Sequence, residues 1–504
     1  MKLVHEFDTL FNRLEPYFHQ NRSFERAREL AFAHLVTLGR HTISRIICAK
    51  NDQQKDWSAD YRLFSRCEWS SNSLFSEIIK ECNSHCSWQQ DAIVLVMDDT
   101  AIKKTGKKIS AVRTLRDPMS LPYHVNLMPA IRFVQASAII TPDNSIEMNR
   151  AIPVYFEEAA PAKKPRQNEP DEAKQQYKKE QKEKNLSVKG HHAVIKLREQ
   201  VDQLEDGKQR PMIVAVDGSY CNRNFLRELP GNTIPIARAR KDIKIFRPAE
   251  NQSPKGRRKV YGERLATPEQ IRKDDNYAWQ TAKIFTAGKY HDVRYKTLAP
   301  VLWQRGTGPM PMRLVIIAPL RYRKNKNSKL LYRKPAYILC PDLELPLQLI
   351  IQYYFFRWDI EVNNRDEKSL LGVGDAQVRS DKSVECQPQF SVIAASLLVL
   401  ASIRAYGAQR TDDYLDLPKW RKPKKRRPSM LDIIAQFRRE IMIEQLKIDL
   451  KQQLQNNKKN KKQRKKPRSR IESQKRGFDV NDKTSTTRLK LPINMISALL
   501  YADC

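Results

Sequence analysis

Two short, unbroken apolar runs stand out in the middle of the chain, and each ends at an acidic residue. The first, AIVLVM at 92–97, leads into Asp98 and Asp99, and the second, PMIVAV at 211–216, leads into Asp217. Continuous apolar runs of this length are typical of strands buried on both faces. Carboxylates at the ends of two such strands meet at the edge where α/β sheets place their ligand sites. The pattern therefore predicts an α/β domain with Asp98 and Asp217 in its site, and Asp99 is a rival for Asp98.

A third carboxylate lies on a predicted helix over residues 350–371. At about 100° per residue, four side chains share one narrow face of this helix: Tyr354, Arg357, Glu361 and Lys368. The simplest interpretation is an ion pair between Arg357 and Glu361, one turn apart on a solvated face. The alignment with a tyrosine and a lysine, in a chain with two strand-end acids, favours instead a face that contributes to a site.

The first 88 residues have apolar positions at helical spacing and predict a small helical domain. Within it, Gly39 followed by Thr42 is typical of a turn and a capped helix, as in a helix-turn-helix element that reads DNA. An ordinary helical hairpin has the same pattern, so both interpretations stay open.

Later segments predict further elements around the strands. Residues 123–140 predict another strand, and 157–185 are charged and poor in apolar residues, which indicates a surface helix. From about 230 to 345, short β-like segments alternate with proline, glycine and basic clusters, which predicts a β-rich insertion with basic loops.

Charge adds a partner to this picture. The 504 residues include 92 lysines and arginines against 57 acids, a formal net charge of +35 that favours a polyanion. Residues 419–470 hold 20 basic and 4 acidic residues, so this segment alone carries +16. The basic runs at 419–428 and 458–470 predict mobile arms that bind phosphates without sequence preference, and 430–454 between them predicts a helix.

Several classes of protein do not fit the sequence. No stretch of about 18 apolar residues is present, and the N-terminus lacks the apolar region of a secretory signal, so we expect no membrane partner and a cytoplasmic location. The eight cysteines are scattered, so we expect reduced thiols. Cys82, His85 and Cys86 resemble half of a zinc site, but no second pair follows at usable spacing, and buried helical cysteines are the simpler interpretation.

Three carboxylates from distant segments suit a two-metal phosphodiester site. Mg²⁺ prefers carboxylate oxygens and keeps water or phosphate in its other positions. A pair of ions about 4 Å apart stabilises both the attacking and the leaving oxygen of an in-line displacement. Arg357 can hold a phosphate through two parallel hydrogen bonds, and Lys368 can attract one as a point charge.

The spacing Tyr354-x2-Arg357-x3-Glu361-x6-Lys368 resembles the YREK signature of a large group of bacterial insertion-sequence transposases. Further pieces resemble the same group: DWSADYRLFSRCEWS at 56–70, DDT at 98–100, VDGSY at 216–220 and LLGVGDAQVRS at 370–380. The resemblance covers most of residues 20–405 and leaves out the basic tail. One departure is that Asn363 and Asn364 stand where the group often has aromatic residues.

The resemblance implies an RNase H-like catalytic domain with a DDE triad, in which Asp98, Asp217 and Glu361 hold two Mg²⁺ ions and Mn²⁺ can substitute. Tyr354 and Arg357 would contact phosphates near the scissile bond, and Lys368 would contact the transposon end. The implied reaction is cut-and-paste transposition, by cleavage of double-stranded DNA at the element's ends and strand transfer into a target. Pairing of two ends implies a homodimer, working at the bacterial nucleoid.

The sequence thus predicts an α/β fold in five parts: a helical DNA-binding domain (1–88), the first catalytic part (89–229), a β-rich insertion (230–345), the Glu-bearing second catalytic part (346–408) and a basic, partly disordered C-terminal arm (409–504). Two other functions remain open. One is a domesticated RNase H-like nuclease that cuts but does not integrate, and the other is a non-enzymatic basic nucleic-acid-binding protein whose acids are structural.

Overall fold

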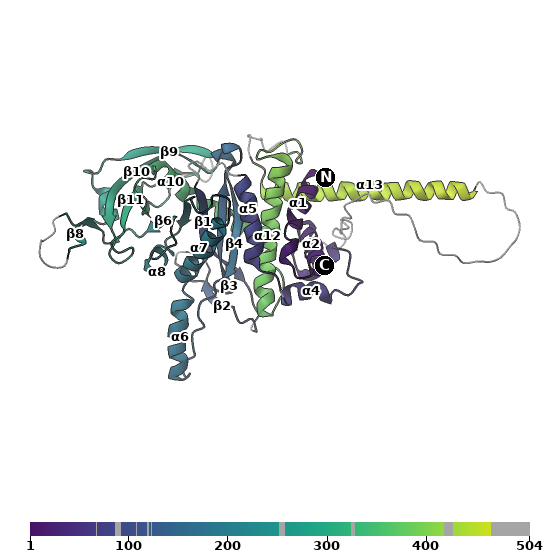
Figure 1. Cartoon of the computed structure of the whole chain (residues 1–504), viewed down its shortest axis with the longest axis horizontal. Coiled ribbons are helices and arrows are strands. Elements are labelled where there is room, and N and C mark those ends of the chain that lie inside the picture. The colour runs from purple at the N-terminus through teal and green to yellow at the C-terminus, as the bar shows by residue number, and fades with distance from the viewer. Residues whose placement is uncertain are drawn as a thin grey trace.

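The computed structural model describes residues 1–464 except 67, 86–91, 107, 118–119, 122, 251–257, 324–327 and 418–426, with side chains described up to residue 453. Most of the basic run at 419–428 and the end of the run at 458–470 therefore lie outside the described residues. Figure 1 shows a sheet region on one side of a long central helix, α12 (Asp381–Tyr406), and the helices α1 (Lys2–Asn12), α2 (Asn21–Val36) and α4 (Ser58–Ser65) on its other side.

The N-terminal region is helical, as the spacing of its apolar residues predicts. Its helices are α1 (Lys2–Asn12), α2 (Asn21–Val36), α3 (Ile43–Ala49), α4 (Ser58–Ser65) and α5 (Ser71–Ser84), with a 3₁₀ turn η1 (Glu15–Tyr17). Gly39 has a positive φ of 72°, and the Thr42 hydroxyl accepts a hydrogen bond from the Arg45 backbone N–H, so the predicted turn and cap are both present. Most of α3 is buried, and Ser44 is its exposed residue.

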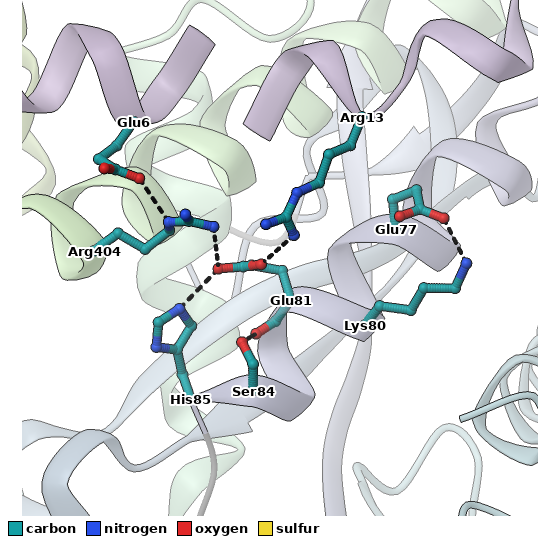
Figure 2. A network of polar contacts seen from close by, with 8 residues as sticks. All are labelled: Glu6, Arg13, Glu77, Lys80, Glu81, Ser84, His85 and Arg404. Carbon is teal, nitrogen blue, oxygen red and sulfur yellow. Dashed lines mark hydrogen bonds and ion pairs between the residues drawn. The ribbon is translucent and has the colours of Figure 1, made fainter. Parts of the chain in front are cut away.

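A network around Glu81 joins α1, α5 and α12 (Figure 2). Arg13 Nη1 lies 2.6 Å and Arg404 Nη1 3.3 Å from the Glu81 carboxylate, and His85 Nε2 lies 2.9 Å from it. Burial alone would raise the pKa of Glu81, but these partners lower it to about 2. His85 is therefore paired with a carboxylate and Cys82 is buried, which favours the structural interpretation of this cluster, and Cys86 lies outside the described residues.

The expectation that all thiols are reduced is wrong for Cys386, which is disulfide-bonded. Cys221 and Cys340 are free thiols. The scattered spacing of cysteines along the chain could not reveal a bridge, because folding brings distant cysteines together.

Five strands form the mixed part of a large sheet, in the order β4-β3-β1-β5-β6. They are β1 (Ile93–Lys103), β3 (Leu127–Ile140), β4 (Arg150–Glu158), β5 (Met212–Val216) and β6 (Thr233–Ala239). β1, β5 and β6 run parallel, whereas β3 and β4 run antiparallel to their neighbours. Both predicted apolar strands are therefore present and adjacent, with every residue of β5 buried.

The remaining strands extend this sheet on both sides. They are β2 (Arg113–Arg116), β7 (Phe246–Pro248), β8 (Tyr261–Arg264), β9 (Gln280–Thr286), β10 (Lys289–Leu302), β11 (Pro311–Ile317) and β14 (Ala336–Cys340), and a separate pair is formed by β12 (Arg321–Tyr322) and β13 (Leu331–Tyr332). β14 pairs with β6, so the β-rich segment continues the sheet and, among the described residues, gives it twelve strands.

Helices between the strands include α7 (Leu186–Asp202), α8 (Arg223–Leu226) and α9 (Pro268–Lys273), and there are short 3₁₀ helices η3 (Pro142–Asn144) and η4 (Ile146–Met148). α6 (Asp171–Glu183) has no buried residue and projects from the body in Figure 1, as its polar composition predicts.

The predicted single helix over 350–371 is instead two helices, α10 (Leu347–Phe356) and α11 (Trp358–Ser369), which meet at Arg357. The following helix, α12, is the one helix of the described chain with the length and composition to cross a membrane, and nearly all of that stretch is buried inside the protein.

The C-terminal helix α13 (Met430–Arg464) is longer than the predicted 430–454, because it continues into the second basic run. Its first turns pack on the N-terminal helices through the buried Phe437 and Ile441, and Glu440 accepts hydrogen bonds from the Leu3 and Val4 backbone N–H groups. Beyond these turns α13 leads away from the body (Figure 1).

Candidate active site

The register of two parallel strands places Asp98 and Asp217 level with each other. β1 pairs with β5 up to Met97 opposite Val216, so each aspartate is the first residue beyond that pairing. The strand itself does not end at Asp98 as the apolar run suggested, because β1 continues to Lys103 through its pairing with β3. The two carboxylates therefore lie side by side where β5 stops and β1 goes on.

Arg357 joins Asp98 to Glu361. Its Nη1 donates to Asp98 Oδ2 at 3.0 Å, and its Nη2 donates to Glu361 Oε1 at 3.1 Å. Arg357 stands at the junction of α10 and α11 and is only 8% exposed, whereas the Glu361 side chain is 40% exposed. The solvated i,i+4 ion pair is thus only half of the contact, because the same guanidinium also reaches the sheet.

Asp98 is held in a strained electrostatic setting. Burial, with the neighbouring charges of Asp99 and Asp217, raises its pKa to about 7, although Arg357 acts in the opposite direction. Burial alone would lower the pKa of Arg357, but the nearby carboxylates, Asp98 first, raise it. A carboxyl with such a pKa favours an additional positive partner when it is ionised.

Asp98 and Asp99 are neighbours on β1 but pair with different arginines. The Arg132 Nε lies 3.3 Å from Asp99 Oδ2, whereas Asp98 faces Arg357. Burial raises the pKa of Asp99, and Lys368 lies near enough to oppose that shift. The contact with the Glu-bearing helix thus distinguishes Asp98 from Asp99.

Tyr354 and Lys368 lie at opposite ends of the same region. Burial raises the pKa of the Tyr354 hydroxyl, against the nearby charges of Arg238 and Arg357. Lys368 is reached by solvent but crowded by protein atoms, and this desolvation lowers its pKa in spite of Glu367 and Asp99. All six predicted residues therefore lie around one edge of the sheet.

Two further arginines belong to this region and were missed from the sequence. Arg238 Nη1 lies 3.6 Å from Asp217 Oδ1, and Arg132 pairs with Asp99. Arg238 follows Ala237, which is opposite Val216 in the β5–β6 pairing, so it is level with Asp217. Only the knowledge that β6 lies beside β5 could have identified it, because nothing in the local sequence marks it.

Two buried polar bridges fix α11 against the sheet. Gln135, opposite Asp98 on β3, donates from Nε2 to Glu367 Oε1 at 2.9 Å. Asn363 Nδ2 donates to the Ala151 carbonyl at 2.9 Å and lies 3.2 Å from Ser137 Oγ. The asparagine that departs from the aromatic pattern therefore has a definite role, which is to orient the helix that carries Glu361.

The donor chemistry of this edge suits a hard divalent cation. Carboxylate oxygens are the ligands that Mg²⁺ prefers, and the buried Oδ1 of Asp217 accepts no hydrogen bond within the described part of the chain. The side chains do not form a closed ligand cage, since no group of three His, Cys, Asp or Glu among the described residues is arranged to hold a metal ion. Arg357 lies between Asp98 and Glu361 instead.

Comparison with known proteins places the chain in a family. The family model described as DDE superfamily endonuclease matches residues 13–310, more than half of the chain. No curated protein matches. Among solved structures, a piggyBac transposase synaptic complex with hairpin DNA matches 88% of this chain and 79% of its own at 11% identity and a TM-score of 0.32. The chain belongs to the DDE superfamily endonucleases; the match includes Asp98 and Asp217 and ends before Glu361.

Proposed function

We propose that the protein is a DNA transposase that moves an insertion sequence by cut-and-paste, with Asp98, Asp217 and Glu361 as its catalytic carboxylates. The observation that carries the proposal is the contact of Arg357 with both Asp98 and Glu361, at an edge where Asp217 is level with Asp98. The strand order β4-β3-β1-β5-β6, in which β3 alone of the five strands runs opposite to the others, supports an RNase H-like catalytic domain.

The metal-binding residues would be Asp98, Asp217 and Glu361. Two Mg²⁺ ions bound there, or Mn²⁺ in their place, would supply Lewis-acid stabilisation of the attacking and leaving oxygens. The chain's own residues would hold these three carboxylates in position. Asp98 and Asp217 are fixed by strand pairing, and Glu361 is fixed through the bridges from α11 to the sheet.

The basic and aromatic residues would hold the DNA. Arg357 presents a planar guanidinium that can bind two phosphate oxygens at once, and Arg238 beside Asp217 adds a second such group. Tyr354 is near enough to both arginines to feel their charges, and Lys368 reaches solvent at the far end of α11, where a transposon end could pass.

The proposed reaction has two steps, and each of them forms one P–O bond and breaks another. A water oxygen attacks the phosphorus at the element's end, and the P–O3′ bond breaks to leave a 3′-hydroxyl and a 5′-phosphate. The freed 3′-hydroxyl then attacks a phosphodiester of the target, and the displaced target strand leaves with its own 3′-hydroxyl. Since two ends must be cut and joined together, the active form would be a homodimer, acting at the nucleoid in a bacterial cytoplasm.

The test uses the full chain and the DNA that flanks its gene. Asp217→Ala should abolish Mg²⁺-dependent end cleavage while duplex binding stays within about threefold of the unaltered protein. Arg240→Ala is the matched control, because Arg240 is 80% exposed and pairs only with Asp242 among the described residues. Cleavage that survives in Asp217→Ala would refute the catalytic assignment.

The same assay separates transposition from the other functions. Cleavage without joining to a second DNA would favour a nuclease that does not integrate. Binding without any Mg²⁺- or Mn²⁺-dependent nicking would favour a non-enzymatic binding protein.

A further inference from the structure

A pocket of about 450 Å³ lies between the start of α2 and one face of α4. Two pairs of arginines line it. Arg22 and Arg26 come from α2, and Arg62 comes from α4 together with Arg66, which caps the C-terminal end of α4. Residues four apart on a helix share a face, so both helices present a pair of guanidinium groups to the same space. We call this pocket the arginine groove.

The arginine groove has more positive charge than its neighbours neutralise. Arg26 pairs with the buried Asp60, 3.1 Å away. The ion pairs formed within the described residues include none to Arg22, Arg62 or Arg66, and all three side chains are exposed. Among the described residues that line the groove, Glu68 is the one carboxylate. Lys382 donates to the Arg66 carbonyl at 3.0 Å, which brings a further positive charge to the rim.

Like charges around one pocket repel one another, and an anion bound among them relieves that repulsion. Guanidinium groups bind phosphate through two parallel hydrogen bonds, which makes clustered arginines typical of phosphate recognition. The pocket is several times larger than a single phosphate group, and its arginines lie along two helices rather than around one point. This layout suits a row of phosphates better than an isolated ion.

We propose that the arginine groove binds the sugar-phosphate backbone of duplex DNA. This contact is separate from the carboxylate edge, by which we mean the part of the sheet edge that holds Asp98, Asp217 and Glu361. α12 packs against α4 on one side and against β4 of the sheet on the other, so it stands between the two places (Figure 1). The choice of DNA over other polyanions rests on the proposed function. The groove would hold DNA through charge, without reading bases.

The experiment measures binding of a random-sequence duplex by fluorescence anisotropy over a range of salt concentrations, without divalent metal. In the full chain, Arg22→Gln, Arg62→Gln and Arg66→Gln are combined. Each phosphate that the protein no longer neutralises makes the slope of log K against log salt shallower by about 0.9, so the triple variant should lose about 2 to 3. The corresponding Arg→Lys triple should keep most of the slope, because it keeps the charge.

The matched control removes the same charge elsewhere. Lys174, Lys178 and Lys182 form an exposed stripe on α6, a helix with no buried residues, and their combined change to Gln should alter the slope by less than about 1. Equal losses in both triples would mean that only total charge matters and would overturn the proposal, as would an unchanged slope in the groove variant. If the triple variant does not fold, Arg62→Gln alone should lower the slope by about 1.

Competition identifies the ligand. Inorganic pyrophosphate should displace the duplex only weakly. Tight pyrophosphate binding that disappears in the groove variant, with duplex binding unchanged, would make the groove a small-anion site and overturn the DNA assignment. Because no arm of this experiment requires cleavage, its outcome is independent of whether the carboxylates are catalytic.

Discussion

The carboxylate edge and the arginine groove use arginine in opposite ways. At the edge, Arg357 is almost fully buried and is shared between Asp98 and Glu361. In the groove, Arg62 and Arg66 are exposed and make no ion pair with another described residue. A buried, shared charge fixes geometry and is costly to remove, whereas an exposed charge acts mainly at a distance and is screened by salt. The position of an arginine, more than its presence, therefore indicates its role.

A buried histidine pair lies where the N-terminal helices meet the loop that follows α11. His34 at the end of α2 and His41 before α3 have ring centroids 4.9 Å apart, and the His41 backbone N–H donates to Asp375, in the loop after α11. Arg438 of α13 donates to the Leu35 and Thr37 carbonyls next to them. Protonation of this pair would disturb the contact between the N-terminal helices and the loop that follows the Glu-bearing helix.

The largest difference between the regions should appear when one arginine is removed from each. Arg357→Ala leaves Asp98 and Glu361 facing each other without their shared cation and also removes a phosphate ligand, so end cleavage should fall by about 10²- to 10³-fold. Arg62→Ala should leave the cleavage rate of bound DNA unchanged when the DNA is saturating. Single-turnover cleavage assays measure the rates of both variants. Equal losses of rate would show that the two regions do not differ in their role in cleavage.

The bridge that orients α11 should respond to pH. Burial raises the pKa of Glu367 from 4.5 to about 7, so the folded chain keeps a proton that the unfolded chain loses, and stability falls as pH rises between these values. Glu367→Gln keeps the acceptor for Gln135 but not the charge. The variant should gain up to about 3 kcal/mol near pH 8 and nothing near pH 4.

Urea denaturation at both pH values measures this gain. A variant that is equally stabilised or destabilised at both would show that ionisation of Glu367 is irrelevant. Cleavage should be retained in Glu367→Gln, whereas Glu367→Ala should lose it in part, because the helix is no longer held.

The histidine pair should make the junction sensitive to acid. Burial lowers the pKa of His41 from 6.5 to about 4, and that of His34 well below its usual value. The unfolded chain therefore binds protons that the folded chain excludes, and stability present above about pH 6.5 is lost towards pH 4, by up to about 3 kcal/mol for His41.

His41→Gln should flatten this part of the stability curve measured by denaturant titration. The exposed His124→Gln is the control and should leave the curve unchanged. A steep acid loss that persists in His41→Gln would assign it to other groups.

The smallest effect should be that of a single groove arginine on stability. Arg62→Gln touches no ion pair among the described residues and is exposed, so the free energy of unfolding should change by less than about 0.5 kcal/mol. Thermal unfolding monitored by circular dichroism tests this. A larger loss would mean that Arg62 supports the packing of α4, and its effect on DNA binding would then be structural.

The contrast also explains which features could be predicted from the sequence. The apolar runs before Asp98 and Asp217 predicted buried strands, because six consecutive apolar residues suit a strand that is covered on both faces, and the structure confirms both strands. The helical spacing of Tyr354, Arg357 and Glu361 gave the correct face but not the break at Arg357, since both halves are good helix formers and the local sequence contains no proline or glycine to mark a break.

Features that depend on tertiary neighbours could not be predicted from the sequence. Arg238 and Gln135 became visible only through strand register, and the groove arginines only through the packing of α2 beside α4. The continuation of α13 into the basic run shows the same limit, because self-repulsion of the lysines predicted an arm that begins earlier. The assignment of metal and phosphate roles remains a prediction.

Binding of Mn²⁺, followed by electron paramagnetic resonance during titration, tests most directly whether Asp98, Asp217 and Glu361 form one metal site. Loss of a residue that only supports a metal ligand typically weakens metal binding by about 10- to 100-fold. Asp98→Asn and Asp217→Asn should each weaken Mn²⁺ binding by more than that, because each removes a proposed ligand. Asp99→Asn, which alters the neighbouring carboxylate paired with Arg132, should keep most of the affinity. Equal Mn²⁺ binding by all of these variants, or none by the unaltered protein, would contradict the proposed metal site.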